Sequence, residues 1–284
     1  MSTAAAGAEQ GEPAPRSTLG QRALDAWDRP LGIALTRLVL LLVLVLGAWR
    51  VWTFAATVGP GAAPGWWYPA WWWAVAFLVA AFALVGHLMH KRLLGFLITD
   101  NHVMSASRAQ AAIWTVTIAS TYVVTVLVSL ARGNPVPELG EGVLLTTMAA
   151  SGSLVGAQLL NVGKANTPAK PEDVSRVVAK GAEAQGLLWR NRDAKDARVK
   201  DIFEGDELAD GEALDAGKAQ MLVLTLILAL VYLLQFFHAL DAASRGAAQA
   251  IVVPPDVPLG TVGLLSVSHG AYLGNKLPRR TPAL

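Results

Sequence analysis

Long apolar stretches without charge alternate with shorter polar segments along this chain of 284 residues. An α-helix needs about 20 mostly apolar residues to cross the hydrocarbon core of a bilayer. The pattern therefore predicts an all-α membrane protein with about six transmembrane helices, of which the fourth and sixth are short enough to be re-entrant instead. The predicted segments are 32–57, 66–88, 107–130, 143–160, 218–238 and 259–275.

Lys and Arg residues are concentrated on every second connection between these segments. The N-terminal tail carries three, the second connection three, the fourth ten when Lys218 is included, and the C-terminal tail three. The alternate connections carry none, one and one. Because positive charges are retained on the cytoplasmic side, both termini and segment 161–217 are predicted to be cytoplasmic. Segment 143–160 should then cross the bilayer, since otherwise the most basic connection would lie outside.

The composition agrees with a membrane protein and excludes several kinds of chemistry. Only 15% of the residues are charged, against about 25% in soluble domains. The chain has no cysteine, which excludes disulfides and thiolate ligands. No spacing of Ser, His and Asp suggests a nucleophile with its base, so we expect no enzyme, no cofactor and no metal site. The basic stretch 190–200 is interrupted by Asp193 and Asp196, so we expect no nucleic-acid partner either.

The chain is predicted to have six parts. Residues 1–30 form a disordered tail, and a cleaved signal peptide is disfavoured because the next apolar stretch is about twice as long as a signal core. The Trp and Tyr residues at 66–73 are typical of an aromatic belt at the headgroups, with an aromatic or carbohydrate platform as the alternative. The other parts are a two-helix hairpin at 31–89, repeat hairpins at 90–160 and 218–277, a charged cytoplasmic linker at 161–217 and a tail at 278–284.

The two hairpins after residue 90 repeat each other in sequence. An offset of 110 residues aligns the third segment with the fifth, and an offset of 118 aligns the fourth with the sixth. Both hairpins start and end on the same side, so they would be parallel repeats related by a pseudo-twofold axis along the membrane normal. Chance similarity between apolar helices is the alternative. Aligned pairs include Gln110 with Gln220, Thr115 with Thr225, Tyr122 with Tyr232, Gly152 with Gly270 and Gly156 with Gly274.

Glycines mark one face of each short segment. Gly152 and Gly156 are four residues apart, as are Gly270 and Gly274, so each pair lies on one helix face. Such faces let helix backbones approach closely in lipid, where apolar burial contributes little. We expect these glycines to pack helices tightly, within or between subunits, and we predict a homo-oligomer in the lipid bilayer.

His269 is the one ionisable residue near the middle of a predicted span. An ionisable group inside the membrane is a candidate for function, and a histidine changes charge near neutral pH. The simpler interpretation is a neutral imidazole bonded to a neighbouring helix, because no acidic partner lies in the spans. A pathway between the hairpins would be lined by Thr115, Tyr122, Thr225, Tyr232 and His269.

Seven acidic residues and no basic one lie between Asp201 and Asp215, interleaved with apolar side chains. The pattern favours a solvated amphipathic helix that docks on the membrane face or on a partner. Calcium binding is the alternative, but the spacing of Asp206, Asp210 and Glu212 does not fit an EF-hand loop.

Four short motifs follow one another between about residues 90 and 277. They are Ser105-Ala106-Ser107-Arg108-Ala109-Gln110 with Trp114-Thr115, Asp201-Ile202-Phe203-Glu204-Gly205-Asp206-Glu207, Lys218-Ala219-Gln220-Met221 with Thr225, and Ser266-Val267-Ser268-His269-Gly270-Ala271-Tyr272-Leu273-Gly274-Asn275-Lys276. In order and spacing they resemble the motifs of a group of uncharacterised bacterial inner-membrane proteins. The resemblance implies that location but no mechanism. The sequence departs from the group at Ala106, Ala109 and Leu224, where the group tends to have Leu, Phe and Phe, so helix packing is expected to differ there.

These patterns favour a membrane protein without catalytic activity. We expect it to self-associate and to dock a cytoplasmic protein partner through segment 161–217, the single large charged connection. The alternative is a small channel or transporter with its pathway between the two hairpin repeats.

Overall fold

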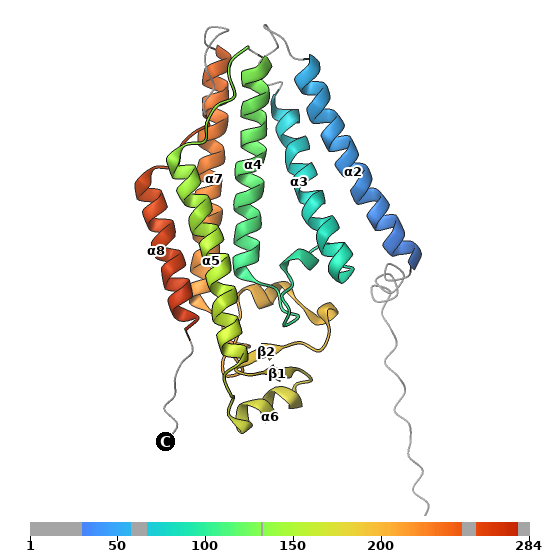
Figure 1. The fold of residues 1–284 in the computed structure, drawn as a ribbon, viewed down its shortest axis with the longest axis vertical. Coiled ribbons are helices and arrows are strands. Elements are labelled where there is room, and N and C mark those ends of the chain that lie inside the picture. The colour runs from blue at the N-terminus through green and yellow to red at the C-terminus, as the bar shows by residue number, and fades with distance from the viewer. Residues whose placement is uncertain (1–29, 58–66, 132, 246–253, 278–284) are drawn as a thin grey trace, which may run out of the picture.

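The structure is a computed structural model that describes residues 30–57, 67–131, 133–245 and 254–277. Among these residues, five helices are long and apolar enough to cross a membrane. The chain is therefore a mostly helical, multi-pass membrane protein, and these helices run side by side along one direction (Figure 1). They are α2 (Pro30–Thr57), α3 (Trp67–His90), α4 (Ala106–Ala131), α5 (Glu141–Ala165) and α7 (Ala216–Arg245).

The fourth and sixth predicted segments have different lengths in the structure. The fourth is part of α5, which has 25 residues and is long enough to span. The sixth forms α8 (Leu259–Asn275), whose 17 residues give a helix about 26 Å long. That is shorter than the ~30 Å hydrocarbon core, so length alone does not establish a sixth crossing. The predicted tails, 1–29 and 278–284, lie outside the described residues.

Helix α4 lies in the middle of the bundle, where it contacts α3, α5 and α7. Helix α2 packs on α3, while α8 packs on both α5 and α7. The segments predicted to be repeats are therefore the hairpins α4–α5 and α7–α8. They meet along two lines, α4 with α7 and α5 with α8.

Helix α4 can occupy the centre because its many polar side chains are small and form hydrogen bonds locally. The hydroxyls of Thr121 and Thr125 each donate to the carbonyl four residues earlier at 2.9 Å. The Trp71 indole N–H of α3 donates to the Ser120 hydroxyl at 3.1 Å. Hydroxyls that bond to their own helix satisfy their polarity without another partner. Their small size lets neighbouring helices approach α4 from several sides.

The predicted aromatic belt is divided between two environments. Trp67 and Trp71 are buried where α3 meets α7, and Trp71 contacts Phe237 edge to face at 4.9 Å between ring centroids. Trp72 is 62% exposed, as a belt residue should be, and Trp66 lies outside the described residues. Part of the aromatic cluster therefore packs α3 against α7. The sequence pattern could not separate these packing residues from the residues of an aromatic belt.

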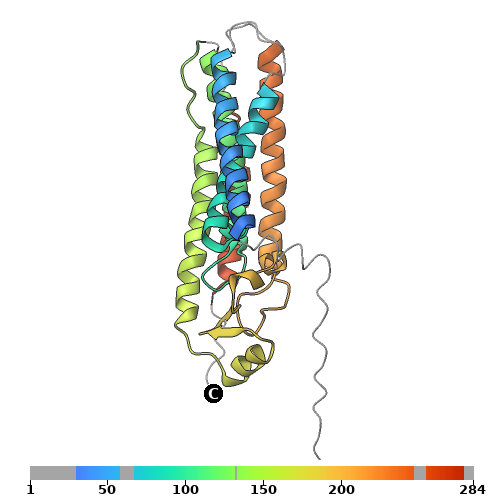
Figure 2. The same cartoon turned by 90° about the vertical axis from the view of Figure 1, so that its right-hand side faces the viewer.

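Residues 166–215, which we call the linker domain, form a small folded unit at one end of the helices (Figures 1 and 2). The strands pair antiparallel, with Glu183 opposite Arg190. The β-hairpin is a minor addition to the predicted all-α fold. The elements are α6 (Pro171–Ala179), β1 (Glu183–Gln185), β2 (Leu188–Arg190) and the 3-10 helices η2 (Ala194–Asp196) and η3 (Val199–Ile202).

The prediction of an amphipathic helix over the acidic run is wrong. Residues 203–215 form turns instead, closed by the backbone hydrogen bonds from Gly205 N–H to the Ala213 carbonyl and from Asp215 N–H to the Phe203 carbonyl. The Asp210 carboxylate accepts a hydrogen bond from the Glu207 N–H, which holds a turn rather than a helix. Aspartates that bond to nearby backbone in this way favour turns over helix interiors.

The connection between α3 and α4 attaches the linker domain to the bundle. Arg92 donates hydrogen bonds to three carbonyl groups of the segment 194–197, at 2.7–3.1 Å. Asn191 is bonded in turn to the backbone of Asn101 and His102. The connection includes the 3-10 helix η1 (Gly95–Leu97). The linker domain is therefore held against α3 and α4 as well as against the helices that flank it in sequence.

Candidate functional site

A cluster of buried ions joins the linker domain to the ends of two membrane helices. Asp206 of the linker domain lies between Lys218, in the first turn of α7, and Lys276, directly after α8. Its carboxylate accepts a hydrogen bond from the Lys218 ammonium at 2.7 Å and forms an ion pair with Lys276. The lysine side chains are only 2% and 5% exposed. A charge so deeply buried is tolerated only when it is paired.

The next residue, Glu207, forms a second buried ion pair. Its carboxylate lies 2.8 Å from the ammonium of Lys164 in the last turn of α5, whose side chain is 3% exposed. A lysine in this position also interacts favourably with the negative end of the helix dipole. Two consecutive acidic residues thus connect the linker domain to α5, α7 and α8.

The charges of the cluster are stable across the physiological pH range. Burial raises the pKa of the Asp206 carboxyl, but the ammonium groups of Lys276 and Lys218 outweigh it and hold this pKa well below its usual range. Burial lowers the pKa of Lys276, but Asp206 outweighs it and raises that pKa above the lysine range. The lowered pKa of the Asp206 carboxyl contributes stability that is lost as the pH falls through that pKa. The raised pKa of Lys276 contributes stability that is lost as the pH rises through that pKa. The contribution of the cluster is therefore constant between about pH 5 and pH 9.

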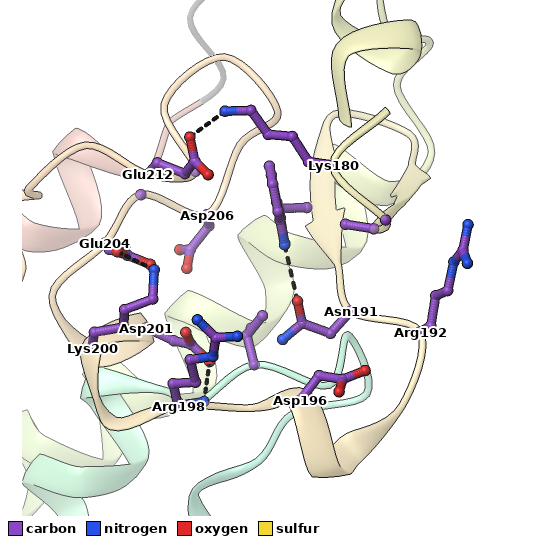
Figure 3. Close-up of a pocket in the computed structure, with 16 residues that line it drawn as sticks. Lys180, Asn191, Arg192, Asp196, Arg198, Lys200, Asp201, Glu204, Asp206 and Glu212 are labelled. Atoms are coloured by element: carbon purple, nitrogen blue, oxygen red, sulfur yellow. Dashed lines mark hydrogen bonds and ion pairs between the residues drawn. The ribbon is translucent and has the colours of Figure 1, made fainter. Parts of the chain in front are cut away.

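Asp206 also lies in the wall of a pocket of about 350 Å³ in the linker domain (Figure 3). That volume lies within the range of small-molecule and side-chain binding sites. An exposed ion pair between Lys180 and Glu212 crosses one side, and a second between Lys200 and Glu204 lies on another. Other polar residues of the lining are Asn191, Arg192, Asp196, Arg198 and Asp201.

The pocket lining determines what chemistry the site can support. It contains no histidine, serine, threonine or cysteine, so no hydroxyl or thiol nucleophile lies there beside an imidazole base. In the part of the chain that the structure describes, no three His, Asp or Glu side chains gather where a metal ion could bind. The lining instead offers charges of both signs and the Trp189 indole, which suits non-covalent recognition.

His269 lies inside the helix bundle and contacts two other helices. Its Nδ1 lies 3.1 Å from the carbonyl oxygen of Ala149 in α5, and its Nε2 meets the side-chain amide nitrogen of Gln110 in α4. A neutral imidazole that donates from Nδ1 and accepts at Nε2 satisfies both contacts. The geometry thus fits the simpler interpretation of this residue, a neutral side chain bonded to neighbouring helices.

Several other buried polar groups lie inside the four helices α4, α5, α7 and α8. They have no hydrogen-bond partner among the described residues, and such groups are costly inside a membrane. Sequence reasoning selected only two of them, because hydroxyls and a tryptophan do not stand out in apolar segments. The atoms are Gln110 Oε1, Trp114 Nε1, Thr146 Oγ1, Ser153 Oγ, Asn161 Oδ1, Thr225 Oγ1, Tyr232 Oη, Ser268 Oγ and Tyr272 Oη.

The five residues predicted to line a pathway are not gathered in one place. Thr225, Tyr232 and His269 are buried. Thr115 is exposed and donates to a carbonyl of its own helix, while Tyr122 is half-buried and donates to the Pro137 carbonyl. Thr115 and Tyr122 thus lie in different environments from the residues that the repeat aligns with them.

The four predicted packing glycines behave differently from one another. A Cβ atom at Gly156 would meet the Leu273 side chain at 3.0 Å, so this glycine allows α5 and α8 to approach closely. A Cβ atom at Gly152, Gly270 or Gly274 would meet nothing within 4 Å. Of these four glycines, therefore, Gly156 alone contributes to tight packing within one subunit.

The residues of the ion cluster were not predicted as a site. Lys218 counts among the positive charges of the fourth connection and Lys276 among those of the C-terminal tail, and both belong to the motifs described above, but neither was predicted to have a role. A signal was present, because Asp206 and Glu207 lie in an acidic run while lysines follow or precede the apolar segments. The sequence could not show that three such charges meet, since they lie up to 70 residues apart.

Comparison with known proteins identified no relative of this chain. A scan against protein-family models, a search of curated proteins and a search of solved structures each returned no match. Function is therefore inferred from the site itself.

We expect Asp206→Asn to destabilise the folded protein by about 3–5 kcal/mol, because two buried ammonium groups would lose their counter-charge. Unfolding of the purified protein in detergent, measured by titration with a denaturant, would show the loss. In Glu204→Gln, the matched control, a more exposed ion pair is removed, which should cost about 0–1 kcal/mol. Equal losses in the two variants would contradict the assigned role of Asp206.

Proposed function

We propose that this protein is a non-catalytic protein of the bacterial inner membrane that self-associates and docks a soluble protein partner through its linker domain. The proposal rests mainly on the pocket of the linker domain, which is lined by charges of both signs and held on three helix ends by buried ion pairs. A surface held in one arrangement loses less conformational entropy when a partner binds. The motifs quoted above support membership of the bacterial group that they resemble.

The placement of charges supports a cytoplasmic position for the linker domain. We propose six crossings, with α8 as the sixth and both termini cytoplasmic. Lys91, Arg92, Lys218 and Lys276 lie at the helix ends that contact the linker domain, whereas Arg245 ends α7 at the other end of the bundle. Positive residues beside transmembrane segments favour the cytoplasmic side. Parallel repeats of the hairpins α4–α5 and α7–α8 are part of the same proposal.

The pocket can receive charged side chains of a partner. Arg198 lines it directly before η3, and Arg192 lines it shortly after β2. Both are exposed, and neither belongs to an ion pair within the described residues. Charges arranged on such a rim direct specificity more than affinity, because they repel partners of the wrong sign. We infer that the partner carries acidic side chains opposite these two arginines.

We expect a photoreactive amino acid at position Arg192 to crosslink to one specific cytoplasmic protein in cells. The same group at Val178, exposed on α6 and outside the pocket, should not give this product. Arg198→Glu combined with the Arg192 probe should reduce the product at least about tenfold, since an unfavourable charge contact costs more than 1.4 kcal/mol. Analysis of the crosslinked bands by mass would decide. The same product from both positions, or no effect of Arg198→Glu, would contradict docking at the pocket.

The outer face of α8 supports self-association. Four glycines and one valine follow one another at intervals of three and four residues, which places them on one side of the helix. A Cβ atom at any of the four glycines would meet nothing within 4 Å, and Val267 is 72% exposed. A second copy of the chain could approach this face closely enough for backbone contact in lipid. The residues are Gly260, Gly263, Val267, Gly270 and Gly274.

We expect Gly270→Leu to weaken self-association at least about tenfold without unfolding the subunit. The new side chain has open space within one subunit but would separate two α8 helices. Subunit counting by single-molecule photobleaching in liposomes, at a range of protein densities, measures the change. Gly163→Leu adds the same side chain at an open position of α5 and is the control. A wild-type protein that stays monomeric at all densities would refute the proposal.

A small channel or transporter is the second candidate function. It is favoured by the buried polar groups between α4, α5, α7 and α8, including the contact of Gln110 with His269. Ordered water satisfies buried polar groups of this kind in other proteins, and a file of such waters can conduct protons.

For this candidate we expect purified protein in liposomes to conduct protons above the rate of empty liposomes. His269→Ala should reduce the flux several-fold, because it removes the buried imidazole of α8 that contacts both α4 and α5. Thr115→Ala, at an exposed position, should leave the flux unchanged. A pH-sensitive dye inside the liposomes reports the flux. No flux above the empty liposomes would exclude this candidate and leave docking unaffected.

A further inference from the structure

A small cavity lies next to the ion cluster, separate from the large pocket but sharing Val103, Trp189 and Asp206 with it. Its volume is about 10 Å³, enough for one small ion or one water molecule but not for a carboxylate or phosphate group. Lys218, Lys276 and Tyr272 also line it. Each of these three side chains is at most 5% exposed.

The cavity carries an excess positive charge. Two ammonium groups, those of Lys218 and Lys276, share the single carboxylate of Asp206. The neighbouring acidic residues are engaged elsewhere, since Glu207 pairs with Lys164 and Glu204 pairs with Lys200. Within the described residues, no second carboxylate forms an ion pair with either lysine of the cluster. A net buried charge of this kind is strongly unfavourable unless an anion compensates it.

Hydrogen-bond donors of the cluster also lack acceptors. Lys276 has three ammonium hydrogens but a single ion-pair partner, and it lies over the Tyr272 ring at 5.3 Å from the centroid. The Tyr272 hydroxyl lies near Ser107 and Lys276, yet it makes no hydrogen bond within 3.5 Å. A buried hydroxyl without a partner costs about 1–3 kcal/mol. The cavity therefore offers unpaired donors and an excess of positive charge, beside one unpaired neutral acceptor, the Asn161 Oδ1 atom in its lining.

We propose that this cavity binds one small monovalent inorganic anion of the halide class. The anion is held by the ammonium groups of Lys276 and Lys218 and by the Tyr272 hydroxyl. It balances the second lysine and so completes the contact of the linker domain with α7 and α8. The proposal is independent of the docking partner and of self-association, since it concerns the inside of one subunit.

The thermal unfolding of the full-length protein in detergent tests the site, at fixed pH and fixed ionic strength. Replacing gluconate by chloride or bromide should raise the unfolding midpoint and reach saturation, because gluconate is too large for the cavity. Tyr272→Phe keeps the ring and both lysines but should raise the apparent Kd for chloride about tenfold, through loss of one hydrogen bond to a charged group. Lys276→Met should abolish the dependence on chloride, since Asp206 and Lys218 then form a neutral pair. Lys200→Met, in an exposed pair, should retain it.

A direct measurement covers the case in which Lys276→Met does not fold. Crystals of the wild-type protein grown in bromide should show an anomalous peak between Lys276, Lys218 and Tyr272, and crystals of Tyr272→Phe a weaker one. A midpoint that depends equally on chloride and gluconate, or a bromide crystal with no anomalous peak in the cavity, would overturn the proposal and indicate a water molecule there.

Discussion

The arrangement of the linker domain on the membrane helices depends on the pairing of Asp206 with Lys218 and Lys276. Charges taken out of water are costly, and they become tolerable only when opposite charges meet at close range. The carboxylate comes from the linker domain and the two ammonium groups from the ends of different helices. Separating the linker domain from the bundle would therefore leave Lys164, Lys218 and Lys276 without their counter-charges. Such a junction favours one arrangement strongly over others.

A second constraint comes from the interior of the bundle. Each backbone group inside a bilayer must be hydrogen-bonded, which helices achieve without outside help. Side chains of α4 extend this rule, because Thr121 and Thr125 bond to their own helix and Ser120 accepts from Trp71 of α3. The hydroxyl-rich helix can then lie at the centre, with α3, α5 and α7 packed around it. Other polar groups, such as those of Thr146 and Ser153 of α5, have no such partner among the described residues.

Asp206 of the ion cluster lines both the large charged pocket and the small cavity next to it, so binding at one would affect the other through this residue. The outer face of α8 carries open glycines above the same helix end that bears Lys276. Docking, self-association and anion binding would then all act on one junction between membrane helices and linker domain. Charge pairing, rather than apolar burial, would connect them.

By itself the sequence predicted membrane-spanning helices, because runs of about 20 apolar residues have no other stable arrangement in lipid. The structure confirms five helices that are long and apolar enough to cross. The sequence also located α8 at 259–275. It failed at the acidic run, where an amphipathic helix was predicted, because Asp210 bonds to backbone and holds turns. Only the tertiary structure decided which charges meet and which glycines pack. Asp206 and Lys276 are 70 residues apart, and local pattern carries no information about contacts at that separation.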